Sequence, residues 1–459
     1  MPATSRNKHR LDPTIEVLGP AKIDSPMKQN PSLRGMDPSS IRLFVKDSDR
    51  MLMSVGLEDF KQHLKSRQEP VSFEMAGPRE KIYFDPPKVK AAIVTAGGLC
   101  PGLNDVIRSI VLTLYHVYGV RNIQGVKYGY QGLIPSFGHD LVELNPAVVS
   151  DIQERGGTML SSSRGLYSVE EIVDSLERLN INILFTIGGD GTLRGSNLVG
   201  EEITRRGLKI AVVGVPKTID NDIKLVARSF GFDTATETAA EVIRSAHAEA
   251  TGAPNGVGLV KLMGRDSGFI AANAALAERE VNFVLIPEAD FDLEGPGGLL
   301  DALETRLKNR GHAVIVVAEG AGQKFFSGGK EEFDPSGNRR LGDIGVFLAD
   351  RIKAHFKKIG VELNLKYIDP SYLIRSRPAS SSDSIFCGFL GAKAVHAGMA
   401  GKTKLVVSLW NNMYVHVPIR EAIVTRKKVE LTGLLWHSVM ESTGQPLLLS
   451  QTRTEKTSQ

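Results

Sequence analysis

The feature that most constrains this chain is an apolar run that ends in a cluster of glycines with an acidic residue inside it. Residues 183–195 read ILFTIGGDGTLRG. Glycine has no side chain, so at Gly188, Gly189 and Gly191 the backbone can approach a phosphate group closely. Asp190 lies within the turn, where a phosphate-bound Mg²⁺ would need a carboxylate ligand. The segment therefore predicts a strand followed by a phosphate-binding turn.

A second motif follows this turn along the chain. Residues 213–223 read VGVPKTIDNDI, again an apolar run that ends in polar side chains. Lys217 and Thr218 supply a cation and a hydroxyl group, and Asp220 and Asp222 supply two carboxylates. One carboxylate to hold a metal and another to accept a proton are the minimum for phosphorylating a hydroxyl group. The two motifs together predict a kinase, with Asp220 facing the acceptor hydroxyl.

Each motif also has a plainer structural interpretation. Asp190 can stabilise the turn by bonding to its own backbone, and Asp220 or Asp222 can cap a helix. A GGDGT turn alone is also found in kinases that act on lipids or on NAD. The second motif weighs against the structural interpretations, and the Lys, Arg and Tyr motifs further along the chain are what favour a sugar phosphate as the acceptor.

The composition excludes several classes of protein. The chain has 459 residues, of which 24% are charged and 42% hydrophobic, with a net charge of +4. These values are typical of a globular protein of two or three domains and give no reason to expect a nucleic-acid or membrane partner. Cys100 and Cys387 are the only cysteines, so we expect no disulfide framework and a cytoplasmic location, although an organelle stays possible.

The order of patterns along the chain predicts an α/β fold. From Val89 onwards, short apolar runs such as 89–98, 208–216 and 312–320 alternate with helical patterns. This alternation is typical of parallel βαβ units, in which ligands bind at the carboxyl ends of the strands. We expect two such units with a cleft between them. Residues 1–88 lack a clear period and are predicted to form an arm-like extension, with a short helix near 51–64.

Five further segments carry candidate binding residues. A glycine-rich turn at 95–105 and an arginine after small residues at 156–165 fit phosphate. The 261–271 segment could present a backbone edge and a guanidinium to a sugar, and Glu319 could accept bonds from its hydroxyls. The 366–378 segment gathers the side chains of Lys366, Tyr372, Arg375 and Arg377, which fit a phosphate. A solvated arginine or a solvated basic face is the plainer alternative for 156–165 and 366–378.

Taken together, the ordered motifs resemble the 6-phosphofructokinase family over about residues 90–440. The chain resembles in particular the longer ATP-dependent members of plants and trypanosomatid protists, which are related to the pyrophosphate-dependent enzymes. The resemblance implies two Rossmann-like αβα domains with mostly parallel sheets. It also implies glycolytic phosphorylation of fructose 6-phosphate at its 1-hydroxyl, with ATP as donor and Mg²⁺ as cofactor, in an allosteric homotetramer.

The resemblance assigns roles to residues that match the family's motifs. Asp220 would be the base, and Arg265 and Lys217 would offset charge on the transferred group. The ATP site would comprise Gly97, Gly98, Arg164, Gly165, Gly189, Asp190, Gly191 and Thr192, with Asp190 on Mg²⁺. The sugar-phosphate site would comprise Thr218, Ile219, Asp220, Met263, Gly264, Arg265, Glu319, Tyr372, Leu373, Ile374 and Arg375, to which we add Lys366.

The same resemblance suggests a division of the chain. Residues 89–231, completed by about 374–425, would bind ATP. Residues 232–373, completed by about 426–445, would bind fructose 6-phosphate, and 446–459 would be a tail.

The chain departs from the family's patterns in the region that binds the phosphoryl donor. Lys217 is typical of pyrophosphate users, whereas Gly191 is typical of ATP users because an aspartate there would repel the nucleotide's α-phosphate. We give Gly191 more weight, so ATP is the expected donor and the pyrophosphate-dependent reaction is the alternative.

A second departure concerns an arginine that bacterial members lend across a subunit interface. It is missing around 255–258, where Lys261 is a possible substitute. A non-catalytic, metabolite-binding regulatory subunit is a more distant alternative.

Overall fold

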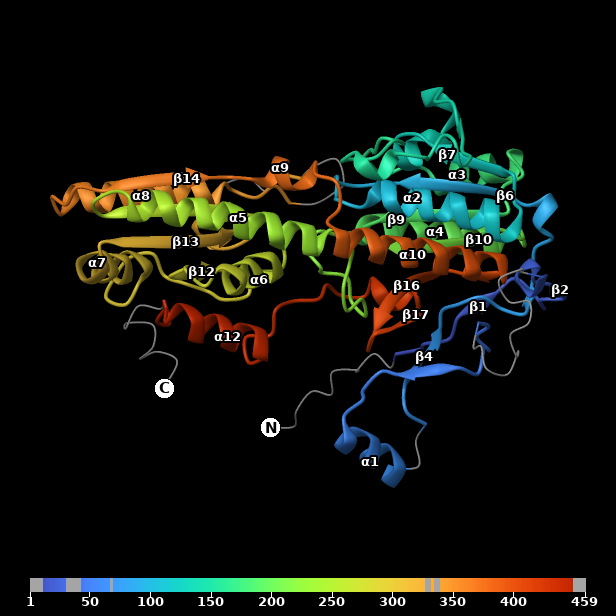
Figure 1. Ribbon diagram of the computed structural model, residues 1–459, viewed down its shortest axis with the longest axis horizontal. Helices are drawn as coiled ribbons and strands as arrows, with labels where there is room; N and C mark the ends of the chain where they lie inside the picture. Colours follow the sequence, from blue (N-terminus) through green and yellow to red (C-terminus); the bar gives the residue numbers. More distant parts are fainter. Residues whose placement is uncertain (1–10, 30–42, 67–68, 327–331, 334–338, 449–459) are drawn as a thin grey trace.

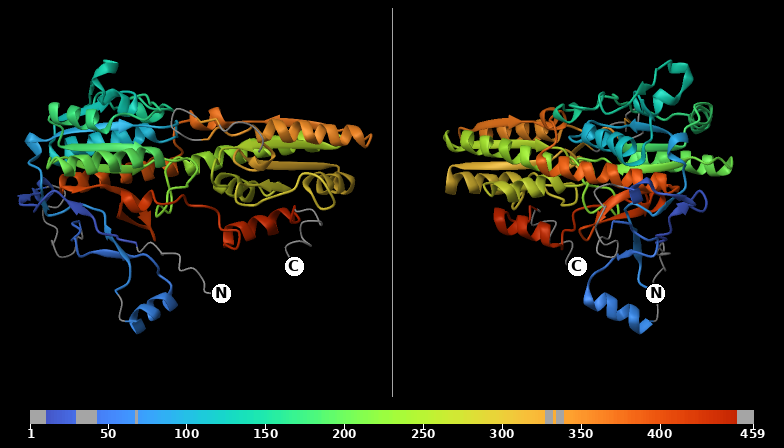
Figure 2. Two further views of the ribbon diagram at one scale, coloured as in Figure 1. Left: turned by 180° about the vertical axis from the view of Figure 1, so that it is seen from behind. Right: turned by 45° about the vertical axis from the view of Figure 1, so that its right-hand side comes forward.

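The computed structural model describes residues 11–29, 43–66, 69–326, 332–333 and 339–448. Within these residues the chain forms two lobes that lie side by side along the longest axis (Figures 1 and 2). Each lobe is built around its own sheet. The predicted α/β architecture is therefore confirmed. The predicted limits of the two domains stay a proposal, and residues 449–459 of the predicted tail lie outside the described residues.

The larger lobe contains a nine-stranded sheet in the order β3-β4-β17-β16-β10-β9-β6-β7-β8. Its five central strands, from β16 to β7, are parallel, and antiparallel strands flank them on both sides. The strands are β3 (Arg50–Leu52), β4 (Ser72–Met75), β6 (Lys90–Thr95), β7 (Asn122–Val126), β8 (Val142–Glu143), β9 (Ile183–Gly188), β10 (Ala211–Pro216), β16 (Leu405–Trp410) and β17 (Met413–Pro418).

Both faces of this sheet are covered by helices, which explains why its central strands are apolar throughout. In β6, Ala91 and Ile93 belong to the same core cluster as residues of α2 (Leu103–Leu112) and α10 (Ser381–Met399). The alternate residues Ala92 and Val94 belong to a second cluster with residues of α3 (Val169–Arg178). A third helix, α4 (Asp190–Arg205), also packs on this second face.

The smaller lobe contains a four-stranded parallel sheet in the order β12-β13-β11-β14. Its strands are β11 (Gly256–Leu262), β12 (Phe283–Leu285), β13 (His312–Ala318) and β14 (Asn364–Ile368). The helices α5 (Phe232–Thr251), α6 (Phe269–Glu278), α7 (Leu299–Arg310) and α8 (Ile344–Lys358) surround it. The short α9 (Ser371–Arg375) follows β14, and α12 (Leu434–Thr443) packs against α6.

The chain passes between the lobes in three places that matter for the site. Residues 217–231 lead from β10 to α5, residues 376–380 lead from α9 to α10, and residues 423–433 lead from α11 (Ile419–Ala422) to α12. The last connection is visible in Figure 1 as the red segment between β17 and α12. Side chains on these connections can therefore contact both lobes.

The N-terminal residues differ from the expected arm in one respect. Part of them is integral to the fold, because β4 pairs with β17 of the large sheet. A further short pair ties them to the rest of the chain, β1 (Glu16–Val17) with β15 (Lys402–Thr403). Within the N-terminal residues, β2 (Ile23–Asp24) pairs with β5 (Lys81–Ile82). The predicted helix begins later than expected: α1 spans Leu57–Ser66, and β3 occupies the start of the predicted range. This helix projects from the body and buries none of its residues (Figure 1).

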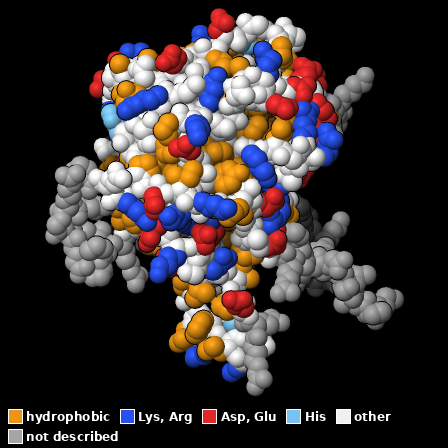
Figure 3. Space-filling view, turned by 90° about the vertical axis from the view of Figure 1, so that its right-hand side faces the viewer, with side chains coloured by type: hydrophobic (Ala, Val, Ile, Leu, Met, Phe, Trp, Pro, Cys, Tyr) orange, Lys and Arg blue, Asp and Glu red, His pale blue; other side chains and the backbone are white. Residues whose placement is uncertain are grey.

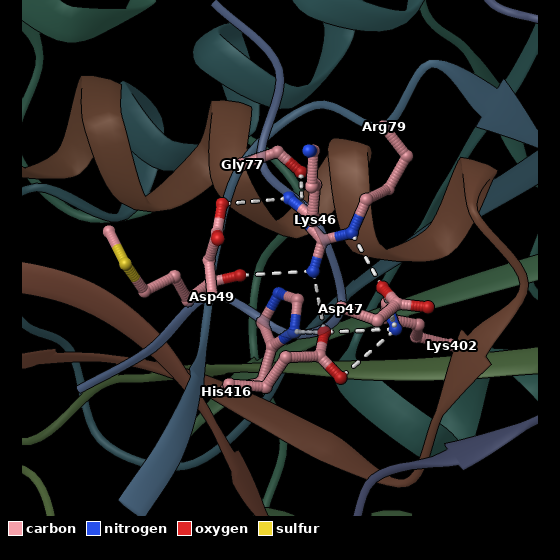
Figure 4. Close-up of polar contacts among 9 residues, drawn as sticks. Lys46, Asp47, Asp49, Gly77, Arg79, Lys402 and His416 are labelled. Atoms are coloured by element: carbon pink, nitrogen blue, oxygen red, sulfur yellow. Dashed lines mark hydrogen bonds and ion pairs between the residues drawn. The ribbon is translucent and has the colours of Figure 1, made fainter. Parts of the chain in front are cut away.

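A buried ionic network fixes this N-terminal part to the core (Figure 4). Glu74 on β4 accepts hydrogen bonds from Arg79 at 2.6 Å and from Nδ1 of His416 at 3.0 Å. The ammonium of Lys402 lies 2.9 Å from the same Glu74 oxygen. A carboxylate out of contact with water is costly unless it is paired in this way. The network therefore selects the register in which β4 lies against β17.

The described surface at the end of the larger lobe has no large patch of charges of one sign. In Figure 3, basic and acidic side chains are interspersed there with apolar ones. Among the described residues, none of the helices has the length and apolar content that a bilayer crossing requires.

Candidate active site

A cavity of about 450 Å³ lies where the two lobes meet. It is lined by residues that follow β6, β9 and β10 in the larger lobe and β11 and β13 in the smaller one. The pairing of the strands explains why distant motifs converge here. Gly188 at the end of β9 lies opposite Pro216 at the end of β10, and Leu262 lies opposite Ala318 in the other sheet. The carboxyl ends of parallel strands meet at one edge, and ligands bind there.

The glycine-rich turn after β6 forms one wall of the cavity. Gly97 has φ +89°, and Gly102, which precedes α2, has φ +94°. A side chain at Gly102 would lie 2.6 Å from the sulfur of Cys387, so this turn requires glycine. Helix α2 begins at Leu103, directly after this glycine. Cys100 is fully enclosed, and burial raises the pKa of its thiol to about 12, which fits a packed residue and not a nucleophile.

The GGDGT turn places the start of α4 at the cavity. Asp190 is the first residue of this helix and Gly189 precedes it. The first N–H groups of a helix have no partner within the helix and carry partial positive charge, so they can receive phosphate. Nothing lies within 4 Å of the position that a side chain on Gly191 would take. The hydroxyl of Tyr130 donates to the carbonyl of Thr192 at 3.0 Å and supports this turn from below.

The turn after β10 carries the remaining groups of the second motif. The ammonium of Lys217 is buried and donates to the carbonyl of Gly98 at 2.8 Å, and burial lowers its pKa to about 8. The hydroxyl of Thr218 donates to Oδ1 of Asp222 at 2.9 Å and accepts from the backbone N–H of Asp220 at 3.2 Å. This local network fixes the direction of the Asp220 side chain.

Asp220 is the side chain with the strongest functional signature. Its Oδ1 is shielded from solvent and has no hydrogen-bond partner among the described residues. Burial, followed by the negative charge of Asp222, raises the pKa of Asp220 to about 7. A carboxyl group with a pKa near the ambient pH is suited to act as a general base.

The smaller lobe reaches this turn through the loop after β11. The backbone N–H of Arg265 lies 3.5 Å from Oδ2 of Asp220, and the hydroxyl of Ser267 donates to the Asp220 carbonyl at 3.0 Å. Glu319 follows β13 and also lines the cavity. Arg164 and Arg375 converge from opposite lobes: a methyl group on Gly98 would lie 3.1 Å from a terminal nitrogen of each. Two guanidinium groups at one point suit an anionic ligand.

The structure therefore brings most of the predicted residues together. Those that line the cavity are Gly97, Gly98, Arg164, Gly165, Gly189, Asp190, Gly191, Thr192, Lys217, Thr218, Ile219, Asp220, Arg265, Glu319 and Arg375.

Six predicted residues lie outside the lining of this cavity. Met263 and Ile374 are buried, and Gly264 has φ +127°, where an added Cβ would lie 2.5 Å from the carbonyl oxygen of Ser267. Lys366, Tyr372 and Leu373 are exposed to solvent. Lys261, the possible substitute for a lent arginine, pairs with Asp343 and Asp369 of its own chain, at 3.0 and 2.9 Å.

Sequence reasoning missed several residues that line the cavity, above all Arg194 and Arg426. Arg194 donates to Oδ2 of Asp190 at 2.9 Å. Its position one helical turn after Asp190 is the signal that would have found it. Arg426 lies in the connection from α11 to α12, where no glycine turn or strand end marks a site.

A metal is compatible with Asp190 but only in one form. The described residues contain no group of three or more His, Cys, Asp or Glu side chains that could hold an ion. Mg²⁺ commonly keeps several waters and binds through one or two carboxylates together with phosphate oxygens. Asp190 has an exposed fraction of 15% and lines the cavity at the start of α4, so it fits that mode.

Comparisons with known proteins agree with this geometry. The family model described as phosphofructokinase matches residues 90–398. The ATP-dependent 6-phosphofructokinase of Borreliella burgdorferi is 54% identical over 95% of this chain and 97% of its own length. That of Trypanosoma cruzi is 47% identical over 82% of this chain and 77% of its own.

Solved structures show the same fold at greater distance. A pyrophosphate-dependent phosphofructokinase from Marinobacter aquaeolei aligns with TM-score 0.64 and 20% identity, over 79% of this chain and 92% of its own. The resemblance to this family and to its long plant and trypanosomatid members is confirmed. On the family match and the identity to these relatives, the chain belongs to the phosphofructokinase family.

Proposed function

We propose that this protein is an ATP-dependent 6-phosphofructokinase, which converts D-fructose 6-phosphate and ATP into fructose 1,6-bisphosphate and ADP in glycolysis. The observation that carries the proposal is Asp220. Its unpartnered Oδ1 and its pKa of about 7 lie in the same cavity as the GGDGT turn, at the meeting of the two lobes. The high identity to relatives named as ATP-dependent 6-phosphofructokinases supports the same activity.

The proposed mechanism assigns one task to each part of the cavity. The N–H groups at the start of α4, with Arg164, hold the phosphates of ATP. The ionised carboxylate of Asp220 accepts the proton of the sugar's 1-hydroxyl as that oxygen attacks the γ-phosphorus in line. Arg265 and Lys217 offset negative charge on the transferred group. Mg²⁺ bound to Asp190 would supply charge neutralisation on the donor's phosphates.

The predicted sugar-phosphate residues receive a proposed division of labour. Thr218, Ile219, Glu319 and Arg375 line the cavity and contact the sugar phosphate directly. Met263, Gly264 and Ile374 shape the loops that carry Arg265 and Arg375. Lys366, Tyr372 and Leu373 are exposed, and we propose that they complete the site when substrate binds or when subunits assemble as a homotetramer. Regulation by an allosteric effector and a cytoplasmic location also stay proposals.

The identity of the donor depends on Gly191 and Lys217. The open space beside Gly191 leaves room for the α-phosphate of a nucleotide. Lys217, the residue that favours pyrophosphate, has its ammonium committed to the carbonyl of Gly98 at 2.8 Å. The same bond ties the glycine-rich turn to the Asp220 turn, which gives this lysine a structural task that is independent of the donor.

The experiment that tests the proposal is a comparison of donors on purified protein. Fructose 6-phosphate turnover is measured with ATP and with pyrophosphate, for the wild type and for Gly191→Asp. We expect ATP to be the better wild-type donor. A carboxylate at position 191 would repel the α-phosphate, and a cost of about 1.4–3 kcal/mol lowers kcat/KM for ATP about 10- to 150-fold.

One control and two contrary outcomes keep the donor test clear. The open space at Gly191 means that the variant should unfold at the wild-type temperature. A wild type that prefers pyrophosphate would show that Lys217 governs the donor. Absence of turnover with either donor would reject the kinase in favour of a regulatory, metabolite-binding protein.

A further inference from the structure

The connection from α11 to α12 places one guanidinium among three acidic side chains. Nη1 of Arg426 donates to Oδ2 of Asp222 at 3.0 Å and to Oδ2 of Asp266 at 2.6 Å. Its Nη2 lies 3.7 Å from Oδ2 of Asp190. These carboxylates follow β10, β11 and β9, so they come from both sheets. The Arg426 side chain thus joins three segments: the GGDGT turn, the turn that carries Asp220 and the loop after β11 that carries Asp266 (the Asp266 loop).

The backbone around Arg426 is held firmly in this place. Arg426 forms a β-bridge with Ile223, and the N–H of Lys427 donates to the carbonyl of Asp222 at 2.8 Å. The ammonium of Lys427 donates to Oδ1 of Asn221 at 3.1 Å. On the other side, the N–H of Val429 donates to Glu288 at 2.8 Å. The guanidinium is therefore presented by a fixed segment and not by a free surface loop.

Asp222 is the group through which Arg426 can influence the chemistry. It is buried, and each of its oxygens has one partner from the site: Oδ2 accepts from Arg426 and Oδ1 accepts from Thr218. Thr218 in turn accepts from the N–H of Asp220. If Arg426 is removed, one oxygen of a buried carboxylate loses its charged partner, which costs more than an exposed ion pair would. The turn that aims Asp220 then loses one of its anchors, the one that fixes the Asp222 side chain to the guanidinium.

We propose that Arg426 is a positioning residue for phosphoryl transfer, which holds Asp222, and so the Asp220 turn, in register with the Asp266 loop of the smaller lobe. The inference rests on the proposed kinase activity but goes beyond its motifs. Arg426 acts on the reaction through Asp222 and needs no contact with the sugar. This guanidinium is the charged bridge between the two halves of the site, beside the hydrogen bond from Ser267 to the carbonyl of Asp220.

The test is a double-mutant cycle between Arg426→Gln and Asp222→Asn, read as kcat and KM with ATP and fructose 6-phosphate. Misplacement of a reacting group by about 1 Å can cost about 100-fold in rate, so we expect Arg426→Gln to lower kcat about 10- to 100-fold. KM for ATP should change less than about threefold, because the effect is on alignment. Residues in one network are not additive, so the double variant should be no more than about threefold slower than the slower single variant.

Two further variants keep the result decisive. Arg426→Lys keeps the charge but offers one ammonium in place of two Nη groups, so it should regain only part of the lost kcat. Removal of the charge in Arg426→Gln also lowers the stability of the fold, which thermal unfolding measures. The double-mutant cycle is therefore repeated with Arg426→Lys in place of Arg426→Gln. Arg420→Gln is the matched control: Arg420 lies in α11, and neither it nor its ion-pair partner Asp12 lines the cavity.

The possible results separate this inference from the proposed function. If the wild type turns over and the kcat of Arg426→Gln lies within about threefold of the wild-type kcat, the positioning role is overturned and the proposed kinase activity stands. A double variant whose loss equals the product of the two single losses would overturn the action through Asp222. Absence of wild-type turnover with either donor would instead reject the proposed function.

Discussion

The two lobes contribute to the same cavity in different ways. In the larger lobe every residue that we predicted for the ATP site lines the cavity. In the smaller lobe Arg265 and Glu319 line it, whereas Lys366 is exposed and Met263 is buried. Phosphate binding uses backbone N–H groups at a helix start, which a short glycine motif can supply by itself. The proposed sugar-binding residues are side chains from several loops, so their arrangement depends more on tertiary placement.

Replacement of Asp220 by Asn should have the largest effect, because this side chain serves both lobes. The amide keeps the size of the carboxyl group but cannot accept the proton. A positioned base contributes about 10²–10⁴-fold, so we expect kcat to fall by about that factor while fructose 6-phosphate still binds. Steady-state kinetics and a binding isotherm for the sugar phosphate measure the two parts separately.

The stability of the same variant provides its control. The pKa of Asp220 rises from 3.8 to about 7 on folding, so its ionised form is a cost to the folded state above pH 7 and costs nothing below pH 4. Asn carries no such cost. Asp220→Asn should therefore melt at a higher temperature than the wild type at pH 8, and the difference should shrink at pH 4. Near-normal turnover in this variant would reject Asp220 as the base.

A matched pair of arginines tests whether the lobes really divide the substrates. Arg164 comes from the larger lobe and Arg375 from α9, yet both approach Gly98. A hydrogen bond to a charged group contributes about 1.5–3 kcal/mol, or about 10- to 150-fold. We expect Arg164→Ala to raise mainly KM for ATP and Arg375→Ala to raise mainly KM for fructose 6-phosphate.

The neighbouring Arg377 offers a control for this pair. It pairs with Glu241 at 3.1 Å and does not line the cavity, so Arg377→Ala should leave both KM values near those of the wild type. If Arg164→Ala and Arg375→Ala instead raise both KM values equally, the cavity works as one anion site and the comparison between the lobes fails.

The sequence predicted the site best where local rules decide the structure. Gly188, Asp190 and Lys217 sit at the ends of apolar strands, and strand ends in a parallel sheet must converge. Nothing local marks Arg426 or Tyr130, because both reach the cavity only through packing of distant segments.

The N-terminal region shows the same limit for the fold. Glu74 makes sense only beside Arg79, Lys402 and His416, and two of these partners are more than 300 residues away in sequence. The hydrophobic periodicity of residues 1–88 therefore could not predict that β4 extends the large sheet. Helix α1 also begins later than predicted because Ser54 and Gly56 form a turn before it. The hydroxyl of Ser54 donates to the carboxylate of Asp59 and accepts from the N–H of Gly56.

The smallest expected effect is a shift in pH dependence, which isolates the smaller lobe's influence on the base. Burial and the charge of Asp222 raise the pKa of Asp220 to about 7, Arg375 lowers it and Glu319 raises it. The base works only when ionised, so kcat/KM should fall as the pH drops below about 7. Glu319→Gln removes a negative charge, which should lower the pKa of Asp220 and move this decline to lower pH.

Arg375→Ala should move the same decline to higher pH, because it removes a positive charge that favours the ionised carboxylate. Both groups belong to the proposed sugar-binding side. Loss of sugar contacts alone would lower kcat/KM in both variants without moving the pH profile in opposite directions. Profiles of kcat/KM from about pH 5 to 9 separate the two explanations. If both profiles shift in the same direction, or neither shifts, then Asp222 and burial alone determine the pKa of Asp220. The smaller lobe would in that case position the sugar without changing this pKa.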